Sequence, residues 1–183
     1  MIKSILNMNK AKLVLSANEV TRAIKELANG ISKNNSDLNN LALIGIHTRG
    51  LPLAKRLKKE LESSTKKDIP LGALDITLYR DDLATVGPAP IVKATDINFN
   101  LTDKVVILVD DVLYTGRTIR AALNELSDFG RPKRIQLAVL IDRGHRELPI
   151  AADYIGKEIK TKADEIIEVK FKETDGTDEV SLK

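Results

Sequence analysis

An uninterrupted apolar run from Val105 to Val109 is the feature that most constrains the fold of this chain. It is rich in β-branched residues, which is typical of a strand buried on both faces of a sheet. Strands covered on both faces belong to parallel sheets, because the crossover connections place helices over them. We therefore expect this run to be a central strand of an α/β domain.

Segments with helical and strand-like patterns alternate around this strand. Apolar spacing predicts helices at 17–33, where Ser16 and Glu19 form a capping-box pattern, at 51–61, and from 117 onward. Buried or alternating strand patterns lie between them, at 41–46, 73–80 and 135–141. Such alternation predicts a parallel sheet flanked by helices.

Other parts of the chain lack strong patterns. Residues 81–103 show no sustained period, and an irregular segment of this length in a compact domain is usually a functional loop. Residues 144–171 contain two short strand-like pieces, at 154–159 and 166–171, which we expect to form a small hood above the sheet. The two ends, at about 1–12 and 173–183, are expected to be loose.

Composition limits the chemistry that the chain can use. It has 183 residues and no cysteine, which excludes disulfides, thiolate zinc sites and cysteine nucleophiles. The lack of a membrane-length apolar run or a signal cleavage pattern favours the cytoplasm. Net charge is +3, and residues 131–162 carry eight Lys or Arg and four Asp or Glu, a local net of 8 − 4 = +4. This segment is either a solvated basic face or a surface for a polyanion.

Two acidic residues and a short polar loop follow the central strand directly. In open α/β sheets, ligands bind at the carboxyl ends of the strands, where Asp110 and Asp111 would lie. Adjacent carboxylates at that edge can accept hydrogen bonds from a vicinal diol. The loop from Tyr114 to Thr118 then leads into a helix, whose N-terminus attracts anions. Carboxylates that can bind a diol, a few residues before a loop that can bind a phosphate, indicate a site for ribose 5-phosphate.

The segment VVILVDDVLYTGRT, residues 105–118, resembles the signature of type I phosphoribosyltransferases, which use 5-phosphoribosyl-1-pyrophosphate. Two other nucleotide or phosphate folds fit less well. Gly45 and Gly50 have the spacing of a P-loop, but Leu and Pro follow instead of Lys and Ser or Thr. A phosphoacceptor receiver domain needs a second acceptor aspartate, and Asp142 stands in the wrong context for it, DRGHRE.

Three more segments narrow the resemblance: IGIHTRG at 44–50, DITLYRDD at 75–82, and IQLAVLIDRGHRELPIAADYIGKEI at 135–159. Over about residues 12–170, the chain is similar to the PyrR-type pyrimidine operon attenuators, which are also uracil phosphoribosyltransferases. The resemblance implies a type I phosphoribosyltransferase-like α/β fold in a single domain, 1–183, with a central parallel sheet flanked by helices and a hood at about 144–171.

The resemblance also implies the reaction and the site. Uracil and 5-phosphoribosyl-1-pyrophosphate would give UMP and pyrophosphate, with Asp110 and Asp111 holding the ribose hydroxyls and Arg80 closing over the transition state. Mg²⁺ would be held mainly by substrate oxygens and water, with no metal-ligating residues of the chain. Other substrate contacts would come from Thr48, Arg49 and Gly50 for pyrophosphate, from Val112, Leu113, Tyr114, Thr115, Gly116, Arg117 and Thr118 around the 5-phosphate, and from Arg143 and Ile155 for uracil.

In this family the protein also senses UMP or UTP and binds the leader of pyrimidine mRNA, and the chains form dimers or tetramers. The residues that match the RNA-binding face are Lys25, Arg146 and Lys157. Three positions depart from the basic pattern of that face, namely Glu26, Asn29 and Ala151. Each missing cation weakens RNA binding. The alternative is therefore a phosphoribosyltransferase or UMP sensor that has lost RNA regulation.

Overall fold

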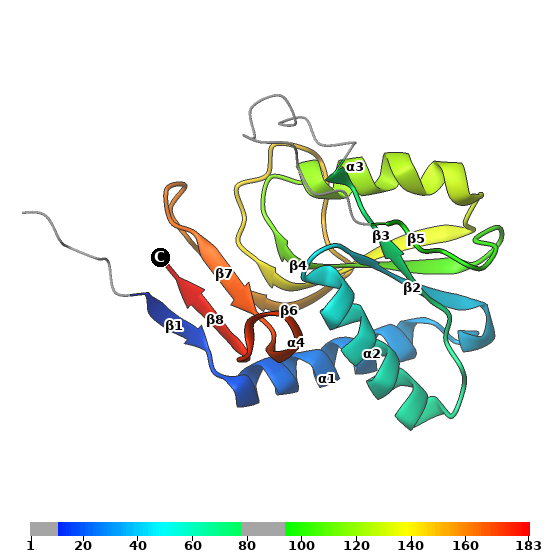
Figure 1. Ribbon diagram of the computed structural model, residues 1–183, viewed down its shortest axis with the longest axis horizontal. Coiled ribbons are helices and arrows are strands. Elements are labelled where there is room, and N and C mark those ends of the chain that lie inside the picture. The colour runs from blue at the N-terminus through cyan, green and yellow to red at the C-terminus, as the bar shows by residue number, and fades with distance from the viewer. Residues whose placement is uncertain (1–10, 78–93) are drawn as a thin grey trace, which may run out of the picture.

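A computed structural model describes residues 11–77 and 94–183 of the protein (Figure 1). Among these residues, five parallel strands form the central sheet in the order β3-β2-β4-β5-β6. The strands are β2 (Leu41–Ile46), β3 (Leu71–Leu74), β4 (Val105–Leu113), β5 (Arg134–Asp142) and β6 (Tyr154–Glu158). This confirms the expected parallel α/β sheet with Val105–Val109 at its centre.

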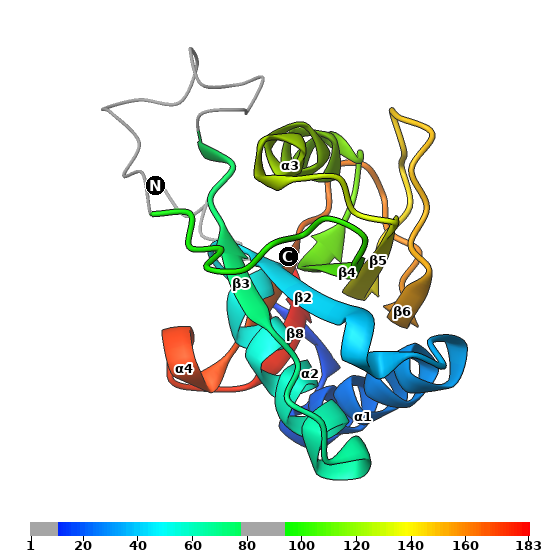
Figure 2. The same ribbon diagram turned by 90° about the vertical axis from the view of Figure 1, so that its right-hand side faces the viewer.

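Helices cover both faces of this sheet, as Figures 1 and 2 show. Helices α1 (Ala17–Asn34) and α2 (Gly50–Thr65) lie on one face, and α3 (Arg117–Leu126) lies on the other. Two short 3₁₀ turns, η1 (Leu38–Asn40) and η3 (Ser127–Phe129), connect the elements. The capping pattern before α1 is confirmed, because the carboxylate of Glu19 accepts hydrogen bonds from the backbone N–H and the hydroxyl of Ser16, at 2.8 and 2.7 Å.

Strand β4 divides the apolar core into two clusters. Ile107 and Val109 pack into the cluster under α1 and α2, whereas Val106 and Leu108 pack into the cluster under α3. All four side chains are fully buried. Burial on both faces explains why apolar and polar residues do not alternate along this run.

A second sheet is built from the two ends of the described chain. Its order is β1-β8-β7, from β1 (Lys12–Leu15), β8 (Glu179–Leu182) and β7 (Ile167–Lys170), and both pairings are antiparallel. The turn helix α4 (Lys172–Asp175) connects β7 to β8. Val180 is fully buried in the core cluster under α1 and α2. The expectation of a loose end at 173–183 is therefore wrong, because β8 is the middle strand of this sheet.

Three expected boundaries also change. Residues 154–158 form β6 at the edge of the central sheet, so this piece does not belong to a hood, and the hood reduces to the connections 143–153 and 159–166. Strand β3 ends at Leu74, where the carboxylate of Asp75 accepts hydrogen bonds from the N–H and hydroxyl of Thr77 and turns the chain. Residues 94–103 pack on the sheet through fully buried Leu101, and residues 81–93 of the expected functional loop lie outside the described residues.

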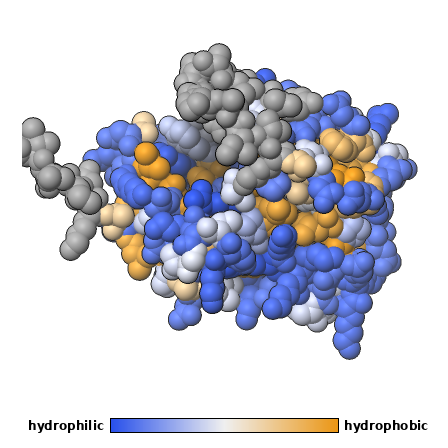
Figure 3. All heavy atoms as spheres, viewed as in Figure 1, coloured by the Kyte–Doolittle hydropathy of each residue, from blue (hydrophilic) through white to orange (hydrophobic). Residues whose placement is uncertain are grey.

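The surface is mainly hydrophilic on the face seen in Figure 3, with apolar areas in the right half of the view and smaller ones at its left. Leu13 and Ile166 are large apolar residues that are 57% and 60% exposed. No helix in the described part of the chain is long and apolar enough to cross a membrane.

The small sheet should contribute strongly to stability through Phe171, which is fully buried and lies under the guanidinium of Arg56 at 5.0 Å from the ring centroid. Replacing Phe171 by Ala should lower the free energy of unfolding by about 3–5 kcal/mol, because it leaves a cavity in the core. Phe129→Ala is the matched control, since Phe129 is 36% exposed; its cost should stay below about 1 kcal/mol. Urea unfolding measures both, and equal costs would show that the small sheet does not share the main core.

Candidate active site

A polar cavity of about 300 Å³ lies at the carboxyl ends of the central strands. Its walls come from four places: the loop between β2 and α2, the end of β3, the end of β4 and the start of α3. The lining residues are His47, Thr48, Arg49, Asp75, Ile76, Thr77, Asp110, Asp111, Val112 and Thr118. The position agrees with the rule that open α/β sheets bind ligands at this edge.

Two glycines allow the loop between β2 and α2 to reach this cavity. A Cβ built on Gly50 would lie 2.4 Å from the carbonyl oxygen of Val109, so only glycine lets the first turn of α2 approach β4 this closely. A Cβ on Gly45 would meet the backbone of Leu51 at 2.6 Å. Gly50 was predicted to contact pyrophosphate, and the close approach that the structure shows at this glycine is between α2 and β4. It places residues 47–49 beside Asp110 and Asp111.

The two adjacent aspartates near the end of β4 form a coupled carboxyl pair. The backbone N–H of Asp111 donates to Oδ1 of Asp110 at 2.9 Å, and Asp110 is only 6% exposed. Burial, with a further contribution from Asp111, raises the pKa of Asp110 well above its ordinary value. Burial also raises the pKa of Asp111, but a hydrogen bond with Asp110 and the charge of Arg49 oppose that shift. The pair is thus destabilised as anions and is poised to gain hydrogen-bond donors or positive charge from a ligand.

The loop from Tyr114 to Gly116 leads into the N-terminus of α3. Gly116 caps the helix with φ = 94°, a left-handed conformation that favours glycine. The carbonyl oxygen of Thr115 accepts from the backbone N–H groups of Glu147 and Leu148, at 3.0 and 3.2 Å. The carboxylate of Glu147 also accepts from Arg117 at 2.6 Å. The 144–150 segment therefore holds the predicted phosphate loop in place, and the first turn of α3 presents its N–H groups to the edge of the sheet.

The structure gathers most, but not all, of the predicted substrate residues at this cavity. Of the pyrophosphate and ribose group, Thr48, Arg49, Asp110 and Asp111 line it, as do Val112 and Thr118. The side chain of Leu113 is 1% exposed and packs in the core under α3, so it does not face the cavity. Thr115, Gly116 and Arg117 precede Thr118 on the phosphate loop but are not among the lining residues. Arg80 lies outside the described residues.

Of the two predicted uracil residues, Arg143 contacts Tyr114 of the phosphate loop, and neither Arg143 nor Ile155 is among the residues that line the cavity. The guanidinium of Arg143 stacks on the ring of Tyr114 at 4.1 Å from its centroid, and it donates to Thr161 and to the carbonyl of Lys162. Arg143 is 6% exposed. Ile155 lies on β6 and is half-buried against the cluster under α3. The two connections that remain of the hood thus meet over Tyr114.

The sequence did not assign His47, Asp75, Ile76 and Thr77 to the site, although all four line the cavity. Asp75 and Thr77 belong to the segment 75–82, which resembles the family, but its pattern of apolar residues does not distinguish cavity residues from ordinary strand residues. The backbone N–H of Asp75 donates to the hydroxyl of Thr95 at 3.0 Å, and that hydroxyl donates to buried Glu125 of α3 at 2.6 Å. Residues near 95, read only as irregular, therefore support one wall of the site.

The three predicted RNA residues differ in their surroundings. Lys25 on α1 and Lys157 on β6 are exposed, and their elements lie together, because a Cβ on Gly156 would contact Ala23 at 3.4 Å. Arg146 instead donates to the carbonyl groups of Tyr114, Gly144 and Ile150, and it pairs with Asp142. Its side chain is 24% exposed. Arg146 thus holds the phosphate loop, a role that its sequence position did not indicate.

The pKa of Asp110 leads to a prediction about stability. Because its pKa is higher in the folded than in the unfolded chain, ionisation of Asp110 opposes folding at neutral pH. Asp110→Asn should therefore raise the Tm at pH 7, and the gain should vanish as the pH falls through about 4, where aspartates of the unfolded chain become protonated. Thermal unfolding without substrates or divalent cations measures this, with exposed Asp164→Asn as the control. A lower Tm for Asp110→Asn at pH 7 would show that the structure stabilises the carboxylate.

Comparisons with known proteins agree with this geometry. Residues 12–173 match the phosphoribosyl transferase domain family. A hypoxanthine-guanine phosphoribosyltransferase from Bacillus anthracis has a similar structure, with a TM-score of 0.72 at 22% identity over 95% of this chain and 99% of that chain. The hypoxanthine phosphoribosyltransferase of Trypanosoma cruzi gives a TM-score of 0.71 at 18% identity, over 93% and 95% of the two chains. At these identities the likeness shows the fold alone.

Sequence relatives are much closer. The Bifunctional protein PyrR of Deinococcus radiodurans is 57% identical over 169 residues, which is 92% of each chain. The protein of the same name from Thermus thermophilus is 54% identical over 173 residues, covering 94% of this chain and 95% of the relative. The family match, the fold and these relatives together show that the chain belongs to the phosphoribosyltransferase family and, within it, to the bifunctional PyrR proteins.

Proposed function

We propose that the protein transfers a phosphoribosyl group from 5-phosphoribosyl-1-pyrophosphate to uracil, and that it also regulates pyrimidine genes by binding leader mRNA when a uridine nucleotide is bound. The observation that carries the enzymatic half is the cavity in which Asp110 and Asp111 meet Arg49 and the start of α3. Close bifunctional relatives over more than nine-tenths of the chain support both halves and disfavour an enzyme that has lost regulation.

The proposed substrate pose follows from the charges around the cavity. The ribose hydroxyls donate to the carboxylates of Asp110 and Asp111, whose burial leaves them short of solvent hydrogen bonds. The 5-phosphate lies against the N–H groups and hydroxyls of the segment 115–118. The pyrophosphate lies at the loop of Thr48, Arg49 and Gly50, where Arg49 supplies positive charge.

Transfer breaks the bond between the anomeric carbon and a pyrophosphate oxygen, and it forms a bond from that carbon to a ring nitrogen of uracil, which loses a proton. Positive charge grows on the ribose and negative charge on the leaving pyrophosphate, so positioning and charge stabilisation are the main requirements. Asp110, Asp111 and Arg49 line the same cavity, which supports the proposal that the carboxylates stabilise the first charge and Arg49 the second.

The donor set of the cavity suits Mg²⁺ in part. Carboxylate oxygens are ligands that Mg²⁺ accepts, but no group of three or more His, Cys, Asp or Glu side chains among the described residues is arranged to hold a metal. We infer that the ion is held mainly by substrate oxygens and water, near Asp110 and Asp111. When bound, it neutralises charge on the pyrophosphate.

The base is proposed to lie near Arg143 and Ile155, beside the phosphate loop. Arg143 is fixed by its stacking on Tyr114 and its hydrogen bonds to the 159–166 connection. Arg80 lies outside the described residues, and we propose for it the role predicted from the sequence, closing over the transition state. The chains are proposed to assemble as dimers or tetramers, which sedimentation would test.

Replacing both Asp110 and Asp111 by Asn should lower turnover of uracil at least about 100-fold, because the ribose loses its charged acceptors. Initial rates with uracil, hypoxanthine, guanine and orotate should also show uracil as the fastest base for the unaltered protein. Circular dichroism checks that the double variant folds. Near-normal turnover in the folded variant would refute the roles of the aspartates, and faster transfer to a purine or orotate would refute the base.

The RNA-binding surface is proposed to lie where α1 and β6 meet, around Lys25 and Lys157. The contact between Gly156 and Ala23 supports this surface, since it brings β6 against α1. The charge of Lys157 also contributes to the lowered pKa of Glu19 on α1, after the hydrogen bonds from Ser16. Ala151, Glu26 and Asn29 reduce the positive charge of this face. Arg146 would act on RNA through the loop that it holds, since its donors are engaged with the protein.

Lys157→Ala should weaken binding to a pyrimidine-leader stem-loop and reduce the slope of log affinity against log salt by about 0.7–0.9, as expected for one lost phosphate contact. Lys59→Ala, at an exposed position on α2, is the control and should leave the slope unchanged. Binding is measured with UMP present over a salt series. If the leader RNA binds no better than a scrambled stem-loop at every salt concentration, the regulatory half is wrong and the enzymatic half stands.

A further inference from the structure

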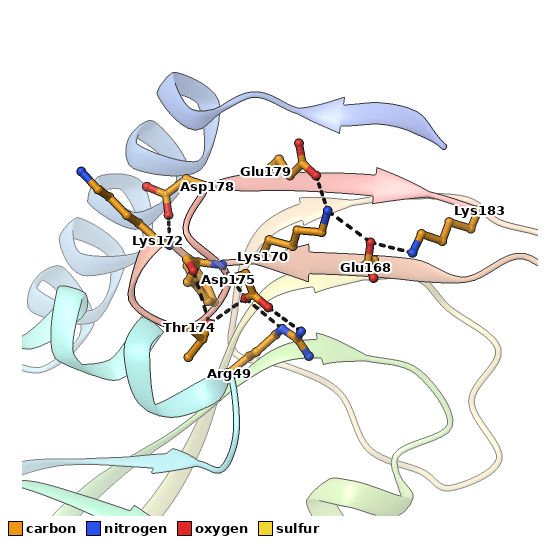
Figure 4. A network of polar contacts seen from close by, with 10 residues as sticks. Arg49, Glu168, Lys170, Lys172, Thr174, Asp175, Asp178, Glu179 and Lys183 are labelled. Carbon is orange, nitrogen blue, oxygen red and sulfur yellow. Dashed lines mark hydrogen bonds and ion pairs between the residues drawn. The ribbon is translucent and has the colours of Figure 1, made fainter. Parts of the chain in front are cut away.

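Arg49, at the start of α2, is paired with a residue from the far end of the chain. Its Nη2 donates to Oδ1 of Asp175 at 2.9 Å and its Nε lies 3.4 Å from Oδ2 (Figure 4). The two side chains are 37% and 18% exposed, so water screens the pair only in part. The carboxylate of Asp175, on the α4 turn between β7 and β8, therefore contacts Arg49, which supplies positive charge to the cavity.

The turn that carries Asp175 holds this carboxylate in a fixed position. Oδ2 accepts from the backbone N–H of Phe171 at 3.0 Å and from the hydroxyl of Thr174 at 2.6 Å. Phe171 itself is fully buried in the core. The hydrogen bond from Arg49 is the main reason why the pKa of Asp175 falls to about 2. Asp175 is therefore ionised and ordered at every pH at which the protein is expected to act.

The pairing uses only one edge of the guanidinium. Arginine presents its N–H groups as a planar fork, and Asp175 occupies the Nε and Nη2 side. Within residues 11–77 and 94–183, Nη1 of Arg49 has no hydrogen-bond partner. Arg49 also lines the cavity together with Asp111, and its charge lowers the pKa of Asp111, so Arg49 is paired with Asp175 and acts on the cavity as well.

We propose that Asp175 is a positioning residue for the phosphoribosyl site. It anchors one edge of the Arg49 guanidinium, so that the other edge faces the pyrophosphate group of the substrate and product. This inference rests on the proposed function and adds a role for the α4 turn, which does not line the cavity. Without Asp175, the carboxylate of Asp111 would attract the guanidinium, which would disturb both the pyrophosphate and the ribose contacts.

A competing role for the contact between Arg49 and Asp175 predicts the opposite change in pyrophosphate affinity when Asp175 is removed. If Asp175 occupied Arg49 in place of an anion, pyrophosphate would have to displace it, and removing Asp175 would tighten pyrophosphate binding. The hydrogen bonds that fix Asp175 within its own turn, together with the second edge of the arginine, favour positioning over competition.

The test compares Asp175→Asn with Asp178→Asn. Asp178 lies in the same turn, accepts from the backbone N–H of Lys172 at 2.8 Å and pairs with Arg56 at 2.6 Å, but it does not touch Arg49. Asp175→Asn should weaken pyrophosphate binding and raise the KM for 5-phosphoribosyl-1-pyrophosphate, each by about tenfold, the effect of one charge-assisted hydrogen bond. The kcat should change much less, and Asp178→Asn should leave both constants near those of the unaltered protein.

Two further measurements separate the possible failures. In an Arg49→Ala background, Asp175→Asn should have no additional effect on pyrophosphate binding, since its role acts through Arg49. Calorimetry with Mg²⁺ and pyrophosphate gives this result whether or not uracil is the base. Unchanged or tighter binding in Asp175→Asn, an equal loss in Asp178→Asn, or no pyrophosphate binding by the unaltered protein would overturn the inference. An unaltered protein that binds pyrophosphate but does not transfer to uracil would overturn the proposed function alone.

Discussion

The close approach between the first turn of α2 and strand β4 determines the geometry of the site. The backbone of Gly50 lies so near the carbonyl of Val109 that a side chain would collide with it. This contact brings the loop that carries Arg49 beside the two aspartates at the end of β4. A positive charge therefore stands next to the buried carboxyl group of Asp110 and the half-buried one of Asp111, and desolvation opposes the ionisation of both. The protein keeps an electrostatically unfavourable pair where a ligand with hydroxyl groups and a cation would relieve it.

The central part of this arrangement could be predicted from the sequence because its signals are local. An apolar β-branched run buried on both faces has no alternation, and the acidic pair, the glycine at positive φ and the helix follow within a few residues. The carboxyl end of a strand and the N-terminus of the helix that follows it together form a ligand site, and both can be located from one short segment of sequence. The parallel sheet was accordingly predicted correctly. Asp110, Asp111 and Thr118 line one cavity, and their roles there stay predictions.

The small sheet and its link to the site could not be predicted, because they depend on contacts between distant residues. Lys12 pairs with Leu182, and Arg49 pairs with Asp175, 126 residues later. The polar C-terminal segment has too few apolar residues to show a strand period, and its β-structure comes from pairing on both sides. For the same reason 154–158 was assigned to a hood, since a short strand does not show which neighbour it joins. The internal hydrogen bonds of Arg146 also lack a local signal.

A crystal structure of the protein with bound UMP tests the central claim most directly. The account predicts that both ribose hydroxyls lie within hydrogen-bond distance of the carboxylates of Asp110 and Asp111. It also predicts that the phosphate lies against the backbone N–H groups at the start of α3, with the base directed toward Arg143. UMP bound with its ribose away from these carboxylates, or with its phosphate at Arg49 in place of the α3 terminus, would contradict the account.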